Sequence, residues 1–384
     1  MSYISTIVLY IFIFLISTLF AIASQRGIAF ASDRKTGLIV QKCKTNLLLF
    51  FLSFIIPWFF ISFTNIGVDY KSYYDMAQIL TWQTITKYSG LEVGFNFVLL
   101  LLKSISRSNL HIVLFLLKTI TISSFFICFY CLRDKLRLGY SVLGYLMLIY
   151  LPSFFLLAQC LASAIVMVAV TLYIRKKKIV LPFIILLIAT QIHNSCFLVL
   201  PCFVLIAILS KHKNYSIFAL GALSLVYLFA VIFAKPIYSL AQRSIPGFHY
   251  NYYGSNDWNG SGLLVFVMYI PLIIIFLLLR KKRQERFLMV SLLAFILTSL
   301  FFRILSYIFV VIERVEFLLS FIYMVLIPIA LFKTYKNKNI YFNNLSITGF
   351  VIGAYFMFRG ILIFNDFVLP RTGLASYQFF NPFS

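Results

Sequence analysis

Two polar residues with chemical potential stand at the ends of adjacent apolar runs. The runs cover residues 160–174 and 179–191 and flank the basic segment Arg175–Lys178. If both runs cross a membrane, Gln159 and His193 return to the same face, opposite the basic segment. A histidine between apolar helices is costly to charge, so we expect a neutral imidazole that can accept a proton. The alternative is a histidine that only caps a helix end.

Arginines within or beside apolar runs are the second candidate group. Arg303 stands inside an apolar run, and Arg314 follows eleven residues later, or about three helical turns, which allows both on one face. Guanidinium groups bind phosphate oxygens in a bidentate fork, so the pair predicts a diphosphate site. A structural ion pair with Glu313 is the alternative. Lys118 and Arg359 are further cations within apolar runs.

Acidic and aromatic residues gather in the segment that follows the second apolar run. Asp69 and Tyr70 lie in this segment, residues 64–90, and Glu92 comes directly after it. A second such segment, residues 236–260, mixes tyrosine, tryptophan and asparagine. These mixtures suit sugar rings, by stacking and hydrogen bonding, and they equally suit an aromatic belt at a membrane interface.

The composition decides the protein class. Hydrophobic residues make up 62% of the 384 residues and charged residues 11%, and the mean hydropathy is +0.99. This predicts an all-α, polytopic membrane protein, because each crossing needs about 20 apolar residues. The alternating segments of a β-barrel are absent from the sequence. We therefore expect residues 1–384 to form a single integral membrane domain, with outer loops at residues 64–90 and 236–260.

The apolar runs predict about twelve crossings, with both termini outside. Residues 91–106 are too short to span comfortably, and we expect a re-entrant or interfacial helix there, after the first outer loop. The expected spans are residues 3–24, 46–63, 109–132, 138–157, 160–174, 179–191, 195–210, 215–235, 262–279, 287–311, 315–332 and 345–364.

The charges agree with this topology. About 22 of the 33 basic residues fall in the expected cytoplasmic segments, as the positive-inside rule requires. The net charge of +23 is therefore mostly topological and does not indicate nucleic acid as a partner.

The six cysteines show no metal-binding spacing and suit buried positions. Motifs for ATP, nucleotide-sugar or metal-dependent chemistry are missing from the sequence, so we expect no cofactor and no metal.

Several short motifs, in this order, resemble the EpsG family of Wzy-type polysaccharide polymerases. Each motif alone is weak, but together they cover nearly the whole chain. Ala158 stands where the family usually carries arginine. The motifs are Gly67-Val68-Asp69-Tyr70 with Tyr73 or Tyr74, Glu92-Val93-Gly94-Phe95, Gln159-x-Leu161-Ala162, Ala189-x-x-x-His193-x-Ser195, Arg314, and Tyr377-x-x-Phe380.

The resemblance implies a polymerase for capsule, exopolysaccharide or O-antigen in the bacterial cytoplasmic membrane. Its substrates would be oligosaccharide repeat units linked to undecaprenyl diphosphate, joined on the outer face, and a chain-length regulator of the same pathway is a possible partner. The expected roles are removal of the acceptor's proton by His193 or Asp69, orientation of that base or of the sugar by Glu92, diphosphate binding by Arg314 and Arg303, and sugar binding by Gln159, Tyr70 and Tyr377. The alternatives are a flippase for the same lipid-linked oligosaccharide and a membrane acyltransferase.

Overall fold

The computed structural model of the chain forms two compact units, Met1–Asn194 with Tyr323–Ser384, and Ser195–Ile322. Each unit is described by itself, and the expectation of a single membrane domain stays a prediction. The structure describes residues 3–32, 39–67, 69–86, 92–176, 178–211, 216–233, 286–306, 318–319, 322–329, 353–357, 360–361 and 377–383, with residues 236, 239 and 273.

Three helices of the first unit are long and apolar enough to cross a membrane. They are α1 (Tyr3–Ser24), α5 (Leu110–Cys131) and α7 (Leu157–Lys176), with 22, 22 and 20 residues. At a rise of about 1.5 Å per residue, each reaches about 30 Å, the thickness of the hydrocarbon core. With the shorter apolar helices beside them, they make the chain a multi-pass membrane protein.

Shorter apolar helices complete the first unit. Asn46 caps α2 (Leu47–Ser62), since its side chain accepts a hydrogen bond from the backbone N–H of Leu49. The helix α6 (Leu138–Tyr145) continues as the π-helix η1 (Leu146–Tyr150), and α8 is Val180–Ile192. A second π-helix, η7 (Ile322–Leu326), and η3 (Asn194–Leu198) are also described.

The boundary between two expected spans is corrected. We expected spans at residues 138–157 and 160–174, but the first helix ends in the short 3-10 helix η2 (Pro152–Phe154), and α7 already begins at Leu157. Pro152 lacks the N–H that an α-helix would need there, so the break comes earlier. Gln159 therefore lies in the first turn of a full-length helix rather than ahead of a short one.

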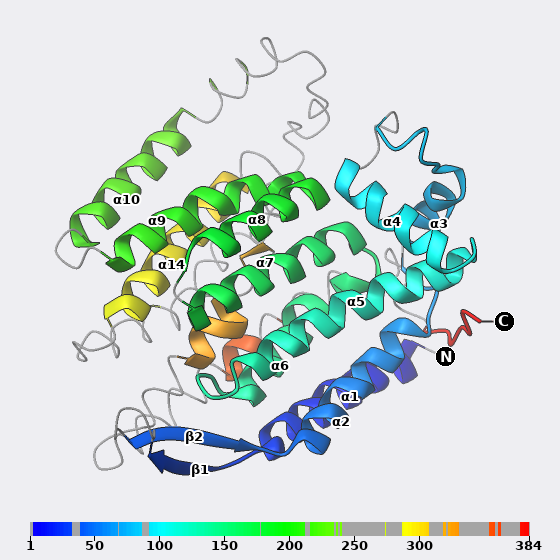
Figure 1. Cartoon of the computed structure of the whole chain (residues 1–384), viewed down its shortest axis with the longest axis horizontal. Helices are drawn as coiled ribbons and strands as arrows, with labels where there is room; N and C mark the ends of the chain where they lie inside the picture. The colour runs from blue at the N-terminus through cyan, green and yellow to red at the C-terminus, as the bar shows by residue number, and fades with distance from the viewer. Residues whose placement is uncertain are drawn as a thin grey trace. The chain divides into compact units, whose positions relative to one another are not determined.

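The centre of the first unit is α7, which contacts both α5 and α8 (Figure 1). Most of its side chains are buried, and many are small, among them Ala158, Ala162 and Ala164. Small side chains let helix backbones approach closely, as is typical of membrane helices. The same unit packs α1 against α2 and α6, and α2 against α5.

The first unit has a basic end, which we define by the described residues 25–32, 39–45, 132–137, 174–176, 178 and 179. The strands β1 (Gln25–Ser32) and β2 (Ile39–Thr45) pair antiparallel there, where only a loop was expected. The pairing gives their backbone amides hydrogen-bond partners. The Gln25 side chain donates to the carbonyl oxygens of Arg133 (3.0 Å) and Leu136 (2.7 Å), and Arg175 Nη1 lies 3.1 Å from the Asp134 carboxylate.

The opposite end of the same helices is the motif end, defined by the described residues 63–67, 69–86, 92–109, 151–160, 192–194 and 377–383. It holds α3 (Tyr70–Ile79) and α4 (Val93–Ile105), which lie away from the hairpin in Figure 1. The basic segments and the sequence motifs thus occupy opposite ends of one helical unit, in agreement with the predicted topology.

The short helix α4 is amphipathic. Val93, Phe97 and Leu101, spaced four residues apart, are exposed, whereas Phe95 and Leu99 are buried. Its 13 residues reach only about 20 Å, too short for a crossing. A short helix with an exposed apolar stripe agrees with the expected re-entrant or interfacial segment, and its depth in the bilayer stays a prediction.

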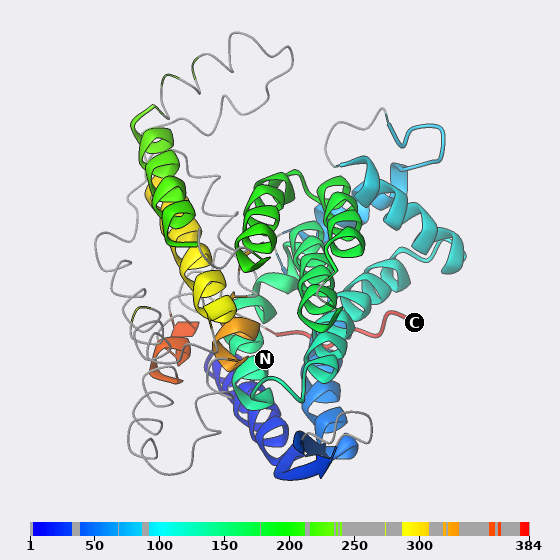
Figure 2. The ribbon, with the colours of Figure 1, turned by 60° about the vertical axis from the view of Figure 1, so that its left-hand side comes forward.

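The second unit consists, in its described part, of α9 (Val199–Lys211), α10 (Ser216–Ile232) and α14 (Arg286–Ser306). Both α9 and α10 pack against α14, and Figure 2 shows α10 beside α14. The ring of Tyr227 stacks on that of Phe301, with ring centroids 4.2 Å apart. The expected span 262–279, the loop 236–260 and the span 345–364 lie mostly outside the described residues, as does part of the span 315–332, so the number of crossings stays a prediction.

The two ends of the first unit should face opposite sides of the membrane. In a cysteine-free background, we expect Lys71→Cys, exposed on α3, to react with a membrane-impermeant maleimide in intact cells. Lys178→Cys, exposed at the basic end, should react only after permeabilisation. The measurement is a gel shift of the labelled protein, and labelling of both positions in intact cells would contradict the topology.

Candidate functional site

The loop that carries Asp69 is fixed by a close backbone contact. Gly67 has a φ of +120°, and a Cβ on it would lie 3.1 Å from the carbonyl oxygen of Phe154. Only glycine adopts this conformation readily, so the loop can lie against the entrance of α7. Asp69 follows directly and occupies the position before the first turn of α3, where its carbonyl accepts the N–H of Tyr73 at 2.9 Å.

Tyr73 connects three of the motifs. Its hydroxyl lies close enough to Asp69 and Glu92 to feel their charges, and it forms a hydrogen bond with the backbone of Ala158, next to Gln159. Burial raises the pKa of Tyr73, the Ala158 bond opposes this, and the two carboxylates raise the pKa further. A neutral hydroxyl therefore lies within reach of the charges of two carboxylates that are separated in the sequence.

Glu92 joins α4 to the end of α8. Its carboxylate oxygen Oε1 accepts a hydrogen bond from the backbone N–H of Asn194 at 2.8 Å. Two residues on, a Cβ at Gly94 would lie 2.5 Å from the carbonyl oxygen of Gln191, closer than such contacts allow. Glycine at this position is what lets the two helix ends touch, and the contact brings the Glu92 motif to the His193 motif.

His193 and Gln159 both lie at the motif end. His193 ends α8 with an extended backbone, and its N–H donates to the carbonyl oxygen of Ala189 at 3.0 Å. Its side chain is partly exposed, while that of Gln159 is only 3% exposed. Asp69 and Glu92 are also partly exposed, so these two carboxylates and the imidazole are accessible titratable groups at the motif end.

A buried lysine, Lys118, binds the backbone beside the Asp69 loop. The Lys118 side chain is 2% exposed, and its Nζ donates to the carbonyl oxygen of Thr64 at 2.9 Å. The same ammonium group lies 5.1 Å from the centre of the Tyr70 ring, a distance typical of a cation–π contact. Tyr70, 8% exposed, has its hydroxyl 3.0 Å from Nδ1 of His111.

The sequence analysis did not single out His111 or assign a site role to Tyr73. For Tyr73 the signal was present, since it lies four residues after Asp69 and so on the same side of a helix. His111 follows the helix cap Asn109, and its contact with Tyr70 depends on how α3 packs against α5.

The segment around Tyr377 closes the motif end. Its hydroxyl donates to the carbonyl oxygen of Phe60 at 2.9 Å, and its N–H donates to Thr6 Oγ1 at 3.1 Å. Further along, Thr64 Oγ1 donates to the carbonyl oxygen of Gln378 at 2.9 Å. The Tyr377 side chain is 3% exposed, so this tyrosine ties the segment to α1 and α2.

Of the two arginines predicted to bind diphosphate, the described residues include only Arg303. Arg303 lies in α14 of the second unit, where its side chain is 4% exposed within an apolar helix. Arg314 and Glu313 lie outside the described residues, and so does Arg359. The predicted pairing of Arg303 with Arg314 therefore stays a prediction. Within the described part of the chain, no group of three or more metal-binding side chains comes together.

The model of the EpsG family matches residues 47–379 of the chain. This range includes the motifs described above, except that it ends one residue before Phe380 of the last motif. Neither the curated proteins nor the solved structures contain a significant match to the chain.

Gly94→Ala tests the contact between α4 and α8. Because the new methyl group would meet the Gln191 backbone, we expect a loss of about 1–3 kcal/mol in stability, the usual cost of overpacking. The measurement is thermal unfolding of the purified protein in detergent. Gly221→Ala in α10 is the matched control, because no atom lies within 4 Å of its added Cβ. Equal melting temperatures for the two variants would show that the contact does not constrain the helices.

Proposed function

Because the chain belongs to the EpsG family, matched over residues 47–379, we propose that it is a polysaccharide polymerase acting on lipid-linked repeat units. The family is associated with exopolysaccharide biosynthesis. The multi-pass architecture suits this role, since the substrate carries a lipid that stays in the bilayer.

The proposed reaction is a glycosyl transfer. A hydroxyl oxygen of the acceptor repeat unit attacks the anomeric carbon of the donor glycan. The bond from that carbon to the phosphate oxygen breaks, and the polyprenyl diphosphate leaves with the bonding electrons. The acceptor hydroxyl loses its proton to a base on the enzyme, which later releases it to water. No nucleotide enters this scheme, because the donor is already activated.

The observation that carries the proposal is the junction between Glu92 and Asn194. It holds the segment of His193 against α4, and the charges of both Asp69 and Glu92 reach the hydroxyl of Tyr73. A partly exposed imidazole and two carboxylates at one end of a membrane unit can supply general-base catalysis, typically worth about 10²–10⁴-fold in rate. We assign proton removal to His193 or Asp69, and orientation of the base or sugar to Glu92.

The remaining residues take supporting roles in the proposal. Arg303 and Arg314 bind the diphosphate and stabilise its charge as it leaves. Gln159 positions a sugar at the entrance of α7. For Tyr70 and Tyr377, burial and hydrogen bonds to the protein favour a role in holding the loop and the final segment in place over direct sugar contact.

The proposal sets the cellular context. The motif end faces outward from the bacterial cytoplasmic membrane, where flipped repeat units arrive, and the polyprenyl diphosphate is the lipid partner. A chain-length regulator of the same pathway is the protein partner that this reaction calls for.

Loss of the base should stop joining without stopping transport. Both His193→Ala and Asp69→Asn are tested in a deletion strain, because either residue could be the base. We expect the variant that removes the base to lower polymer formation by about 100-fold or more. Arg314→Ala should do likewise by weakening diphosphate binding. Gel analysis of lipid-linked glycans should show single repeat units on the outer face and no ladder, in variants that reach the membrane normally. Repeat units trapped on the cytoplasmic face would instead identify a flippase.

Two variants of Glu92 distinguish a structural role of this residue from a chemical one. Glu92→Gln keeps an oxygen that can accept the Asn194 N–H, whereas Glu92→Ala removes it. If the carboxylate charge takes part in the reaction, both variants should lose polymer, while only Glu92→Ala should lose thermal stability. Full polymer formation by Glu92→Gln would reduce Glu92 to a structural anchor.

A further inference from the structure

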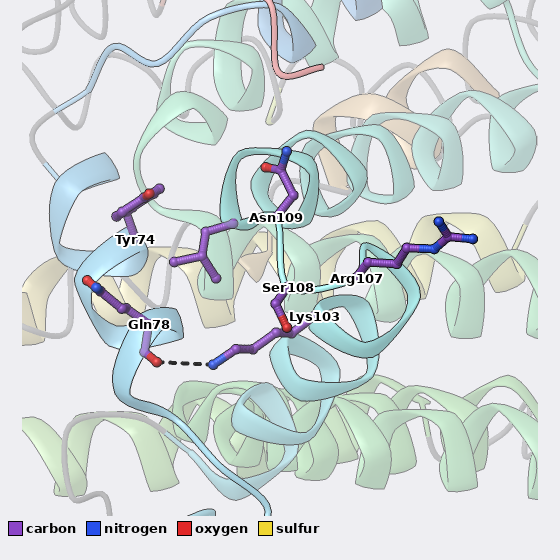
Figure 3. A pocket seen from close by; sticks show the side chains of 7 residues that line it. Tyr74, Gln78, Lys103, Arg107, Ser108 and Asn109 are labelled. Carbon is purple, nitrogen blue, oxygen red and sulfur yellow. Dashed lines mark hydrogen bonds between the residues drawn. The ribbon is translucent and has the colours of Figure 1, made fainter. Parts of the chain in front are cut away.

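A pocket separate from the Glu92–Asn194 junction opens at the motif end. It lies between α3 and the turn from α4 into α5, and has a volume of about 550 Å³, within the usual range for ligand sites (Figure 3). Its lining residues are Tyr74, Gln78, Lys103, Arg107, Ser108, Asn109 and Leu110.

The cations of this pocket are not available to an anion inside it. Nζ of Lys103 donates to the carbonyl oxygens of Ala77 (2.8 Å), Gln78 (3.1 Å) and Leu80 (3.0 Å), which uses all three of its protons. Arg107 is exposed, and Figure 3 shows its side chain directed away from Tyr74 and Gln78. The pocket is therefore better suited to a neutral ligand than to a phosphate.

The remaining side chains suit a ring that carries hydroxyl groups. Tyr74 supplies an aromatic ring, which rests against the imidazole of His111 with ring centroids 4.8 Å apart. Gln78 supplies an amide and Ser108 a hydroxyl. The Asn109 side-chain oxygen accepts from the N–H groups of His111 and Ile112, which leaves its NH₂ group directed elsewhere. Aromatic, amide and hydroxyl groups around one space match the faces and hydroxyls of a sugar.

The wall of the pocket is held rigidly. Arg107 and Ser108 both have positive φ angles, 53° and 66°, which are uncommon outside glycine and often mark functional sites. The backbone N–H of Ser108 donates to the carbonyl oxygen of Lys103 at 2.9 Å, and Lys103 ties the turn to α3. A rigid wall can present its polar groups in a fixed geometry.

The pocket has one wall far from Glu92 and one wall near Asp69. Glu92 precedes α4, and the turn that lines the pocket lies at the other end of this helix, 13 residues and about 20 Å away. The other wall comes from α3, where Tyr74 follows Asp69 by five residues, about 7.5 Å along the helix. A glycan with one sugar in the pocket can therefore extend towards the Asp69 loop with a neighbouring sugar. We propose that this pocket is a subsite for a neutral sugar of the glycan, near the reacting end but not at it, and that it retains the growing chain between additions. This inference rests on the proposed polymerase function.

Direct binding tests the ligand class. The full-length protein in detergent is titrated with oligosaccharide fragments of the host strain's own surface polysaccharide, which carry no lipid or phosphate. We expect binding by the wild type, and a dissociation constant at least fivefold higher for Tyr74→Ala and Gln78→Ala. Gln83→Ala, an exposed glutamine outside the pocket, is the matched control and should bind as the wild type. Competition by inorganic pyrophosphate, or equal binding by all variants, would overturn the assignment.

Polymer length tests the role. In the deletion strain, Tyr74→Ala and Gln78→Ala should form the first linkages but give a modal chain length reduced by half or more, whereas Gln83→Ala should give the normal ladder. An unchanged ladder in both pocket variants would refute the subsite and leave the polymerase proposal intact. A normal ladder in the deletion strain itself would instead refute the polymerase proposal.

Discussion

The hydrogen bond between the Asn194 backbone and the Glu92 carboxylate, with the tight approach at Gly94, is the contact on which the motif end depends. It joins the start of a short surface helix to the end of a membrane helix about a hundred residues later in the chain. A charged acceptor for a backbone N–H makes a stronger bond than a neutral one, and a glycine beneath it removes the steric obstacle. Together with the packing of α8 against α7, this junction holds the His193 segment at the motif end.

The polar side chains of the motif end differ in how far they are exposed. Lys118, Gln159 and Tyr377 are almost completely buried, while Asp69, Glu92 and His193 are partly exposed. Buried polar groups are costly unless they have partners, and Lys118 and Tyr377 donate hydrogen bonds to backbone carbonyls that hold loops in place. The groups left in contact with the surroundings are those that can exchange protons with a substrate.

The sequence predicted the helical class and most helix positions, because long apolar runs have few other structures available in a membrane. It also placed the basic segments and the motifs at opposite ends. It failed at Pro152, where the break came several residues earlier than expected, and it missed the strand pair β1–β2, which depends on pairing between segments. The surroundings of Tyr73 likewise arise from packing between segments that are far apart in the sequence. Local sequence patterns do not predict such packing. The sequence indicated the pairing of Glu92 with Asn194 only indirectly, because both motifs were expected on the same side of the membrane.

The segment from Tyr377 to Phe380 has a consequence for how the protein is made. Membrane helices can insert one after another during synthesis, but the bonds from this segment to Thr6, Phe60 and Phe63 join residues more than 300 positions apart. The loop of Asp69 shares these bonds through Thr64. The motif end therefore reaches its final form only after residues 377–380 have been synthesised and have joined α1, α2 and the Asp69 loop. A chain whose synthesis has not reached this point already holds the motifs of Asp69 and Glu92, but it lacks these closing bonds.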